Sequence, residues 1–179
     1  MKDTLIVNLI ASPGTGKSTT MAGVFSKLKQ EGYDCEMVTE FAKELVWECR
    51  NETFKDELYL FAKQSHRLFR VNGKVDIIIT DRPLILTILY NNRYGKKSKQ
   101  LDALVLSEFN EYNNLNIFLT RTKKYNPNGR NQTEAESNEI SYEIENNVLK
   151  SNHIPYFKMD ADLEAVDNII KLIKNKIDN

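Results

Sequence analysis

The sequence is poor in the residues and runs that mark several classes of protein. Only two of its 179 residues are cysteine, and Cys35 and Cys49 lack the spacing of a metal site. They therefore favour free thiols in a reducing compartment over a disulfide framework. No apolar run reaches the length of a transmembrane helix, and the first one, at residues 4–10, is too short for a signal peptide. We expect a cytoplasmic protein that has no part in a membrane.

Net charge is also lacking. The 25 lysine and arginine residues balance the 25 aspartate and glutamate residues, so no overall field attracts nucleic acid or a membrane surface. The sequence contains no internal repeat, linker-like stretch or low-complexity segment. A length of 179 residues suits one domain with a sizeable core. We therefore expect residues 1–179 to form a single domain.

The most informative stretch is ASPGTGKST at residues 11–19. An apolar run at residues 4–10 predicts a buried strand before it, and residues 18–30 have the spacing of a helix after it. A small-residue loop between strand and helix that ends in Lys-Ser matches the phosphate-binding loop, because backbone N–H groups and a helix N-terminus attract phosphates. Lys17 is predicted to reach the terminal phosphates of ATP, and Ser18 to bind Mg²⁺. The predicted ATP-binding residues are Ser12, Pro13, Gly14, Thr15, Gly16, Lys17, Ser18 and Thr19.

Strands and helices alternate along the chain. Strands are predicted at residues 4–10, 35–39, 75–80, 115–120 and 154–159. Helices are predicted at residues 18–30, about 41–50, 55–71, 84–90, 101–112, 134–149 and 163–177. This alternation predicts an α/β fold, with a parallel sheet covered by helices on both faces.

Charged side chains follow several of the predicted strands, where parallel sheets bind their ligands. Asp81 follows a strongly apolar strand, as a Walker B acid does, and is predicted to hold Mg²⁺ with Ser18. Its alternative role is to cap the helix after Pro83. Glu40 can accept the proton of a substrate hydroxyl, or stabilise the start of a helix. Arg82 can bind a phosphate or an attacking oxygen, or form a surface ion pair.

Residues 121–133 are polar and have no apolar period. They are predicted to form a mobile lid, with either Arg121 or Arg130 supplying a guanidinium to the transition state of phosphoryl transfer. A turn at Pro127 and Asn128 gives this segment defined local structure.

Three other features allow two interpretations each. Gln64 can bind a nucleobase edge, because its amide both donates and accepts hydrogen bonds. Trp47 and Phe61 can stack on a base, but we interpret both as core residues. A basic loop either contacts a nucleic-acid backbone or is solvated. Its residues are Arg93, Lys96, Lys97 and Lys99.

Four segments together resemble small phosphate-loop kinases: SPGTGKST at 12–19, TEFAKE at 39–44, DRP at 81–83, and residues 121–130. The sequence resembles the ATPase/kinase proteins of tailed bacteriophages, which are similar to the nicotinamide riboside kinase domain. It is more distantly similar to deoxynucleoside kinases and thymidylate kinase. The resemblance spans nearly the whole chain and implies the strand order 2-3-1-4-5. It also implies that Glu40 is the base for a sugar hydroxyl and that Asp81 and Arg82 contact metal and phosphate.

The residues and the resemblance lead to the same functional expectation. We expect a kinase that uses ATP and Mg²⁺ to phosphorylate a nucleoside or nucleotide, with a deoxypyrimidine favoured. Lys17, Glu40, Asp81, Arg82, Arg121 and Arg130 are the predicted catalytic residues, and Glu40, Gln64 and Arg82 the predicted substrate contacts. One alternative is a kinase for a hydroxymethylated pyrimidine in phage DNA, and another is an ATP-hydrolysing switch that acts through partners. The oligomeric state is open, with a dimer plausible.

Overall fold

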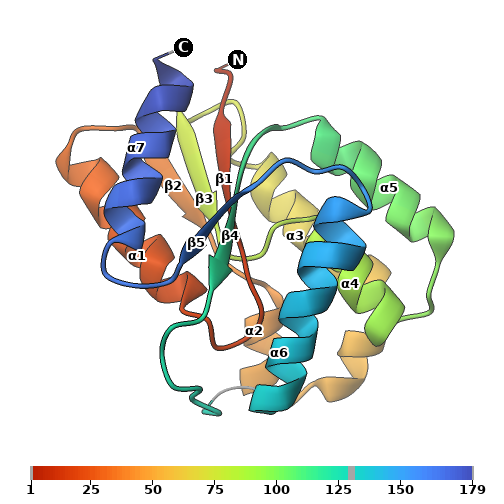
Figure 1. Cartoon of the computed structure of the whole chain (residues 1–179). Coiled ribbons are helices and arrows are strands. Elements are labelled where there is room, and N and C mark those ends of the chain that lie inside the picture. Colours follow the sequence, from red (N-terminus) through yellow and green to blue (C-terminus); the bar gives the residue numbers. More distant parts are fainter. Residues whose placement is uncertain (1, 129–131, 179) are drawn as a thin grey trace.

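Five parallel strands form one sheet at the centre of the structure (Figure 1). The computed structural model describes residues 2–128 and 132–178. The strands are β1 (Leu5–Ile10), β2 (Cys35–Val38), β3 (Ile77–Thr80), β4 (Asn113–Thr120) and β5 (Phe157–Asp160). Their order across the sheet is β2-β3-β1-β4-β5, which confirms the predicted α/β fold and strand order. Because the strands are parallel, their carboxyl ends meet at one edge of the sheet.

Helices cover both faces of the sheet, so the core has two apolar layers (Figure 1). The helices are α1 (Lys17–Gln30), α2 (Ala42–Trp47), α3 (Glu57–Phe69), α4 (Leu86–Arg93), α5 (Lys99–Asn110), α6 (Glu134–Glu143) and α7 (Ala165–Ile177). One layer joins α1 and α7 to side chains such as Leu9 and Ile117. The other joins α3, α4, α5 and α6 to Phe118 and its neighbours. None of the described helices is long and apolar enough to cross a membrane.

The structure contains the predicted elements, with some boundaries moved. The helix expected at residues 55–71 begins later, because Asp56 caps α3 by accepting a hydrogen bond from the backbone N–H of Tyr59. A short 3₁₀ segment, η1 (Asn51–Lys55), precedes that cap. The helix expected at residues 134–149 changes character midway, where α6 continues as a π-helical segment, η2 (Ile144–Lys150).

The central strand β1 is buried along its whole length, yet it carries a polar residue. Asn8 donates hydrogen bonds to the side-chain oxygens of Asn114 and Asn116 on β4, at 2.8 and 2.9 Å. Asn116 in turn donates to the backbone carbonyl of Pro155, at 3.0 Å. These bonds compensate for the burial of the Asn8 amide, which would otherwise be costly.

The two aromatic residues interpreted as core residues differ in their surroundings. Phe61 is buried in the layer formed by α3 to α6, as predicted. The prediction for Trp47 is wrong, since its side chain is 70% exposed at the last residue of α2. Helix α2 has only six residues and buries only Leu45, so its outer face has no layer to pack against.

Candidate active site

The phosphate-binding loop joins β1 to α1, as the sequence predicts. Gly14 and Gly16 have positive φ angles of 81° and 118°, which side chains other than glycine rarely adopt. Gly16 stands directly before the first turn of α1, where free N–H groups and the helix dipole favour an anion. The Thr15 hydroxyl donates to the carbonyl of Ser12, at 3.0 Å, and so closes the loop.

Lys17 follows the loop and lies over it. Its ammonium donates to the backbone carbonyls of Ala11 and Ser12, at 2.8 and 3.1 Å. A lysine in this position presents a compact positive charge at the place where the loop and the helix N-terminus attract phosphate.

Asp81 joins the phosphate-binding loop to the end of β2. One carboxylate oxygen accepts a hydrogen bond from the Ser18 hydroxyl at 2.7 Å, and the other accepts one from the backbone N–H of Glu40 at 3.0 Å. The residue is 3% exposed. The predicted helix-capping role does not apply, because no side chain of the described residues caps α4.

The oxygen atoms of Ser18 and Asp81 fit a magnesium ion. Mg²⁺ binds through one or two protein oxygens and completes its shell with water and phosphate oxygens. The described residues contain no group of three or more histidine, cysteine, aspartate or glutamate side chains that could hold a metal by themselves. We therefore expect a magnesium ion here to be bound jointly by the oxygens of Ser18 and Asp81 and by the phosphates of a bound nucleotide.

Gln64 fixes the segment after β2 from the neighbouring helix α3. Its side-chain oxygen accepts from the backbone N–H of Phe41 at 3.0 Å, and its amide nitrogen donates to the carbonyl of Thr39 at 3.3 Å. The residue is buried. In this structure Gln64 thus holds the two neighbours of Glu40, while its predicted contact with a nucleobase stays a prediction.

Arg82, which follows β3, lies in a buried cluster with side chains from α3, α4 and the segment after β2. Its guanidinium carbon is 4.2 Å from the ring centroid of Tyr90 on α4, which suits a cation–π contact. Its Nε is 4.0 Å from a carboxylate oxygen of Glu40, and its Nη2 is 3.7 Å from Oε2 of Glu57 on α3. The Arg82 side chain is only 7% exposed, so the alternative of a surface ion pair is wrong.

Glu57 is a buried carboxyl group beside Arg82. Burial raises its pKa from 4.5 to about 7; the charge of Arg82 opposes this rise, and Glu40 and Asp56 add to it. Burial likewise raises the pKa of the Tyr90 phenol. No motif in the sequence marks Glu57 as part of a site, because a glutamate in the first turn of a helix is common.

A family model described as an AAA domain matches residues 6–165. The chain belongs to this family. Among solved structures, the AAA domain is similar to the NadR protein in complex with NR, with a TM-score of 0.75 and 18% sequence identity over 97% of this chain. It spans about half of the NadR chain, 52% of its length. No curated protein matches the sequence. The similarity to NadR bears out the predicted fold, while phage origin and likeness to thymidylate kinase stay predictions.

The predicted lid of the AAA domain begins with an arginine that is engaged with α6. Arg121 forms an ion pair with Glu134 at 2.6 Å and donates to the side-chain oxygen of Asn138. Its guanidinium also lies 5.4 Å from the ring centroid of Tyr125. Arg130, the other predicted lid arginine, lies outside the described residues.

Ser137 on α6 contacts the phosphate-binding loop directly, although no motif in the sequence marks it. Its hydroxyl is fully buried and donates to the backbone carbonyl of Pro13 at 2.6 Å, with the Ser12 hydroxyl 3.1 Å away. A capping box between Thr133 and Glu136 fixes the start of this helix. Helix α6 therefore supports both the loop and the first residue of the predicted lid. The contacts of Ser137 with Pro13 and Ser12 join residues 124 and 125 positions apart, so no local pattern could reveal them.

The basic loop is less available to a nucleic acid than its composition suggests. Arg93 forms ion pairs with Glu139 and Glu143, at 2.6 and 2.8 Å, and its side chain is 17% exposed. The three lysines of the predicted loop, Lys96, Lys97 and Lys99, are all exposed.

Proposed function

We propose that this AAA domain is a kinase that transfers the terminal phosphoryl group of ATP to a hydroxyl of a small nucleoside-type acceptor. The observation that carries the proposal is the bridge made by Asp81 between the Ser18 hydroxyl and the backbone of Glu40. This bridge holds a candidate proton acceptor beside the phosphate-binding loop. A nucleotide-hydrolysing switch does not need such a carboxylate for an acceptor hydroxyl.

Each residue has a defined task in this proposal. Lys17 and the loop bind the phosphates of ATP, and Ser18 with Asp81 holds Mg²⁺, which neutralises charge on the phosphates. Glu40 accepts the proton of the acceptor hydroxyl. The oxygen of that hydroxyl forms a bond to the terminal phosphorus of ATP while the bond between this phosphorus and ADP breaks. Arg82 offsets the negative charge that develops there.

A nucleoside or nucleotide acceptor, with a deoxypyrimidine favoured, is the finer part of the proposal. The NadR structure was determined in complex with NR, and the likeness of fold supports a small acceptor. A hydroxymethylated base in DNA is the less favoured alternative. The balanced charge of the chain and the pairing of Arg93 with two glutamates reduce the basic surface that DNA binding would need.

The experiment that tests this proposal follows the γ-phosphate of radiolabelled ATP. The acceptors are nucleosides, nucleoside monophosphates, and plain and hydroxymethylated DNA, with the Lys17→Ala variant as the blank. We expect label in a free nucleoside or monophosphate. Label in hydroxymethylated DNA alone would overturn the small acceptor. Release of free phosphate with no labelled acceptor would overturn the kinase and favour the switch.

A further inference from the structure

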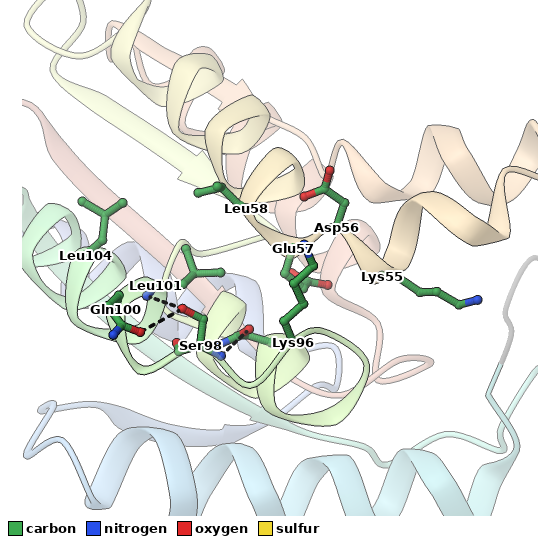
Figure 2. A pocket seen from close by; sticks show the side chains of 10 residues that line it. Lys55, Asp56, Glu57, Leu58, Lys96, Ser98, Gln100, Leu101 and Leu104 are labelled. Atoms are coloured by element: carbon green, nitrogen blue, oxygen red, sulfur yellow. Dashed lines mark hydrogen bonds between the residues drawn. The ribbon is translucent and has the colours of Figure 1, made fainter.

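A pocket of about 290 Å³ opens between the first turn of α3 and the junction of α4 with α5 (Figure 2). Leu58, Leu101 and Leu104 give it apolar walls. Lys55 and Lys96, both exposed, contribute to its lining. This volume is just below the range for small-molecule sites, roughly 300–1,000 Å³, so the pocket suits a single ring or one part of a larger ligand.

Glu57 presents the pocket with a buried hydrogen-bond acceptor that has no donor. Its side chain is 3% exposed, and Oε2 is the buried side-chain oxygen without a hydrogen-bond partner among the described residues. The nearest cation, Nη2 of Arg82, is 3.7 Å away, which is too far for a hydrogen bond. A buried acceptor in this state is costly unless a ligand supplies the missing donor.

The other buried polar residue of the pocket differs in this respect. Asn91 donates to the carbonyl of Ser98 at 2.9 Å and to Asp102 at 2.8 Å, and it accepts from the N–H of Ser98 at 3.2 Å. These bonds hold the loop between α4 and α5. The wall of the pocket at Asn91 is therefore held by hydrogen bonds, whereas Oε2 of Glu57 lacks a hydrogen-bond donor among the described residues.

Glu57 also connects the pocket to the proposed active site. The guanidinium of Arg82 faces both Glu57 and Glu40, at 3.7 and 4.0 Å. A ligand that reaches Glu57 with one end is thus separated by one side chain from the carboxylate proposed to accept a proton. Figure 2 shows Glu57 on α3 and Lys96 on the loop before α5 at the same pocket.

We infer that this pocket holds the ring of the acceptor and that Glu57 takes a hydrogen bond from an amino group on that ring. The inference rests on the proposed function and names the substrate class as an amino-substituted pyrimidine nucleoside. Leucine walls suit the faces of a flat ring. Above its pKa of about 7, the Glu57 carboxylate is ionised and accepts hydrogen bonds only. A ring that presents a carbonyl oxygen at the same place leaves Oε2 without a donor.

Calorimetric binding of deoxycytidine and deoxyuridine tests the inference, because the two differ in the amino and carbonyl groups of the ring. At about pH 8, where Glu57 is mostly ionised, we expect the wild-type protein to bind deoxycytidine about tenfold more tightly, since a site built to pair a polar group disfavours the analogue that lacks it. Glu57→Gln should lose most of this preference. Leu104→Asp, at a residue that is 44% exposed, should weaken both ligands, while Leu163→Asp, at a residue that is 91% exposed outside the pocket, should change neither.

Equal affinity of the wild-type protein for the two nucleosides would overturn the inference. So would no measurable binding of deoxycytidine, a preference that survives Glu57→Gln, or affinities for both nucleosides that Leu104→Asp leaves unchanged. The proposed function fails separately. If phosphoryl transfer occurs but neither Glu57→Gln nor Leu104→Asp changes it, the proposed kinase activity is supported and the acceptor pocket is not. If deoxycytidine binds tightly but receives no phosphoryl group, the pocket is supported and the kinase activity is not.

Discussion

The two halves of the candidate site are built in different ways. The donor half comprises residues 11–19 and Asp81, and most of it is one continuous stretch between β1 and α1. The acceptor half comprises Glu40, Arg82, Glu57 and Tyr90, which come from four separate places in the chain. The donor half uses backbone geometry and small side chains, whereas the acceptor half buries charges around one guanidinium.

The geometry of the two halves is fixed by different kinds of contact. Glycine conformations and short-range hydrogen bonds shape most of the donor half, and Asp81 and Ser137 support it from distant parts of the chain. The acceptor half depends on α3 and α4 being packed against β3, because Glu57 and Tyr90 have to meet Arg82. Substitutions in the donor half should therefore leave stability nearly unchanged, whereas substitutions in the acceptor half should affect stability as well as transfer.

Lys17→Ala should have the largest effect. Loss of the ammonium removes the point charge at the terminal phosphates, so transfer should fall by at least about 10³-fold. The fold should persist, because the ammonium hydrogen-bonds backbone carbonyls of the loop and is not itself part of the apolar core. Steady-state kinetics and thermal unfolding measure the two effects. Lys29→Ala, at an exposed residue of the same helix, is the control. Similar activity in both variants would contradict the proposed role of Lys17 in binding the phosphates of ATP.

Arg121→Ala should reduce turnover strongly if the lid supplies its arginine from this position. Loss of a guanidinium that stabilises the transition state costs on the order of 10³-fold in rate. Arg93→Ala is a matched control, because Arg93 also pairs with glutamates of α6 but lies outside the strand ends. We expect Arg93→Ala to lower the unfolding temperature with little change in kcat. Turnover near wild type in both Arg121→Ala and Arg130→Ala would refute the lid.

The pH dependence of stability should report the burial of Glu57. Its pKa is about 7 in the folded chain and near 4.5 otherwise, so the folded state binds more protons between these values. The free energy of unfolding should then fall as pH rises from about 4.5 to 7, by on the order of 3 kcal/mol. Burial causes the shift; Arg82 opposes it, and Glu40 and Asp56 add to it.

Chemical denaturation of wild type and Glu57→Gln at several pH values measures this effect. The variant lacks the titrating carboxyl and should be the more stable protein at pH 8, with a small difference at pH 4.5. Parallel pH profiles for the two proteins would mean that Glu57 is ionised without cost.

Ser137→Ala should have a smaller effect than the changes at Lys17, Arg121 and Glu57. Ser137 lies on α6 and contacts the donor half through the phosphate-binding loop. It removes the hydroxyl that donates to the carbonyl of Pro13, so we expect about a tenfold rise in the KM for ATP and a smaller change in kcat. Ser137→Thr keeps the hydroxyl and should restore part of the affinity. Ser141→Ala on the same helix is the control. An unchanged KM for ATP in Ser137→Ala would show that the contact does not position the loop.

Much of the fold follows from the sequence, because the apolar runs and helical periods are local properties. The phosphate-binding loop is equally local, and the charged residues after β2 and β3 follow from the rule for parallel sheets. The roles of Glu57, Tyr90 and Ser137 depend on contacts between distant segments, which composition and spacing do not contain. Trp47 illustrates the same limit, because the sequence around an aromatic residue does not show whether another element packs over its side chain.

The central claim is that the acceptor half serves the chemistry of transfer while the donor half binds ATP. Glu40→Gln tests it most directly, because the amide keeps the size of the side chain and leaves the backbone N–H that binds Asp81. We predict that phosphoryl transfer falls by about 10²–10⁴-fold, with the affinity for ATP unchanged. Transfer at the wild-type rate, or a loss of ATP binding that matches the loss of transfer, would contradict the account.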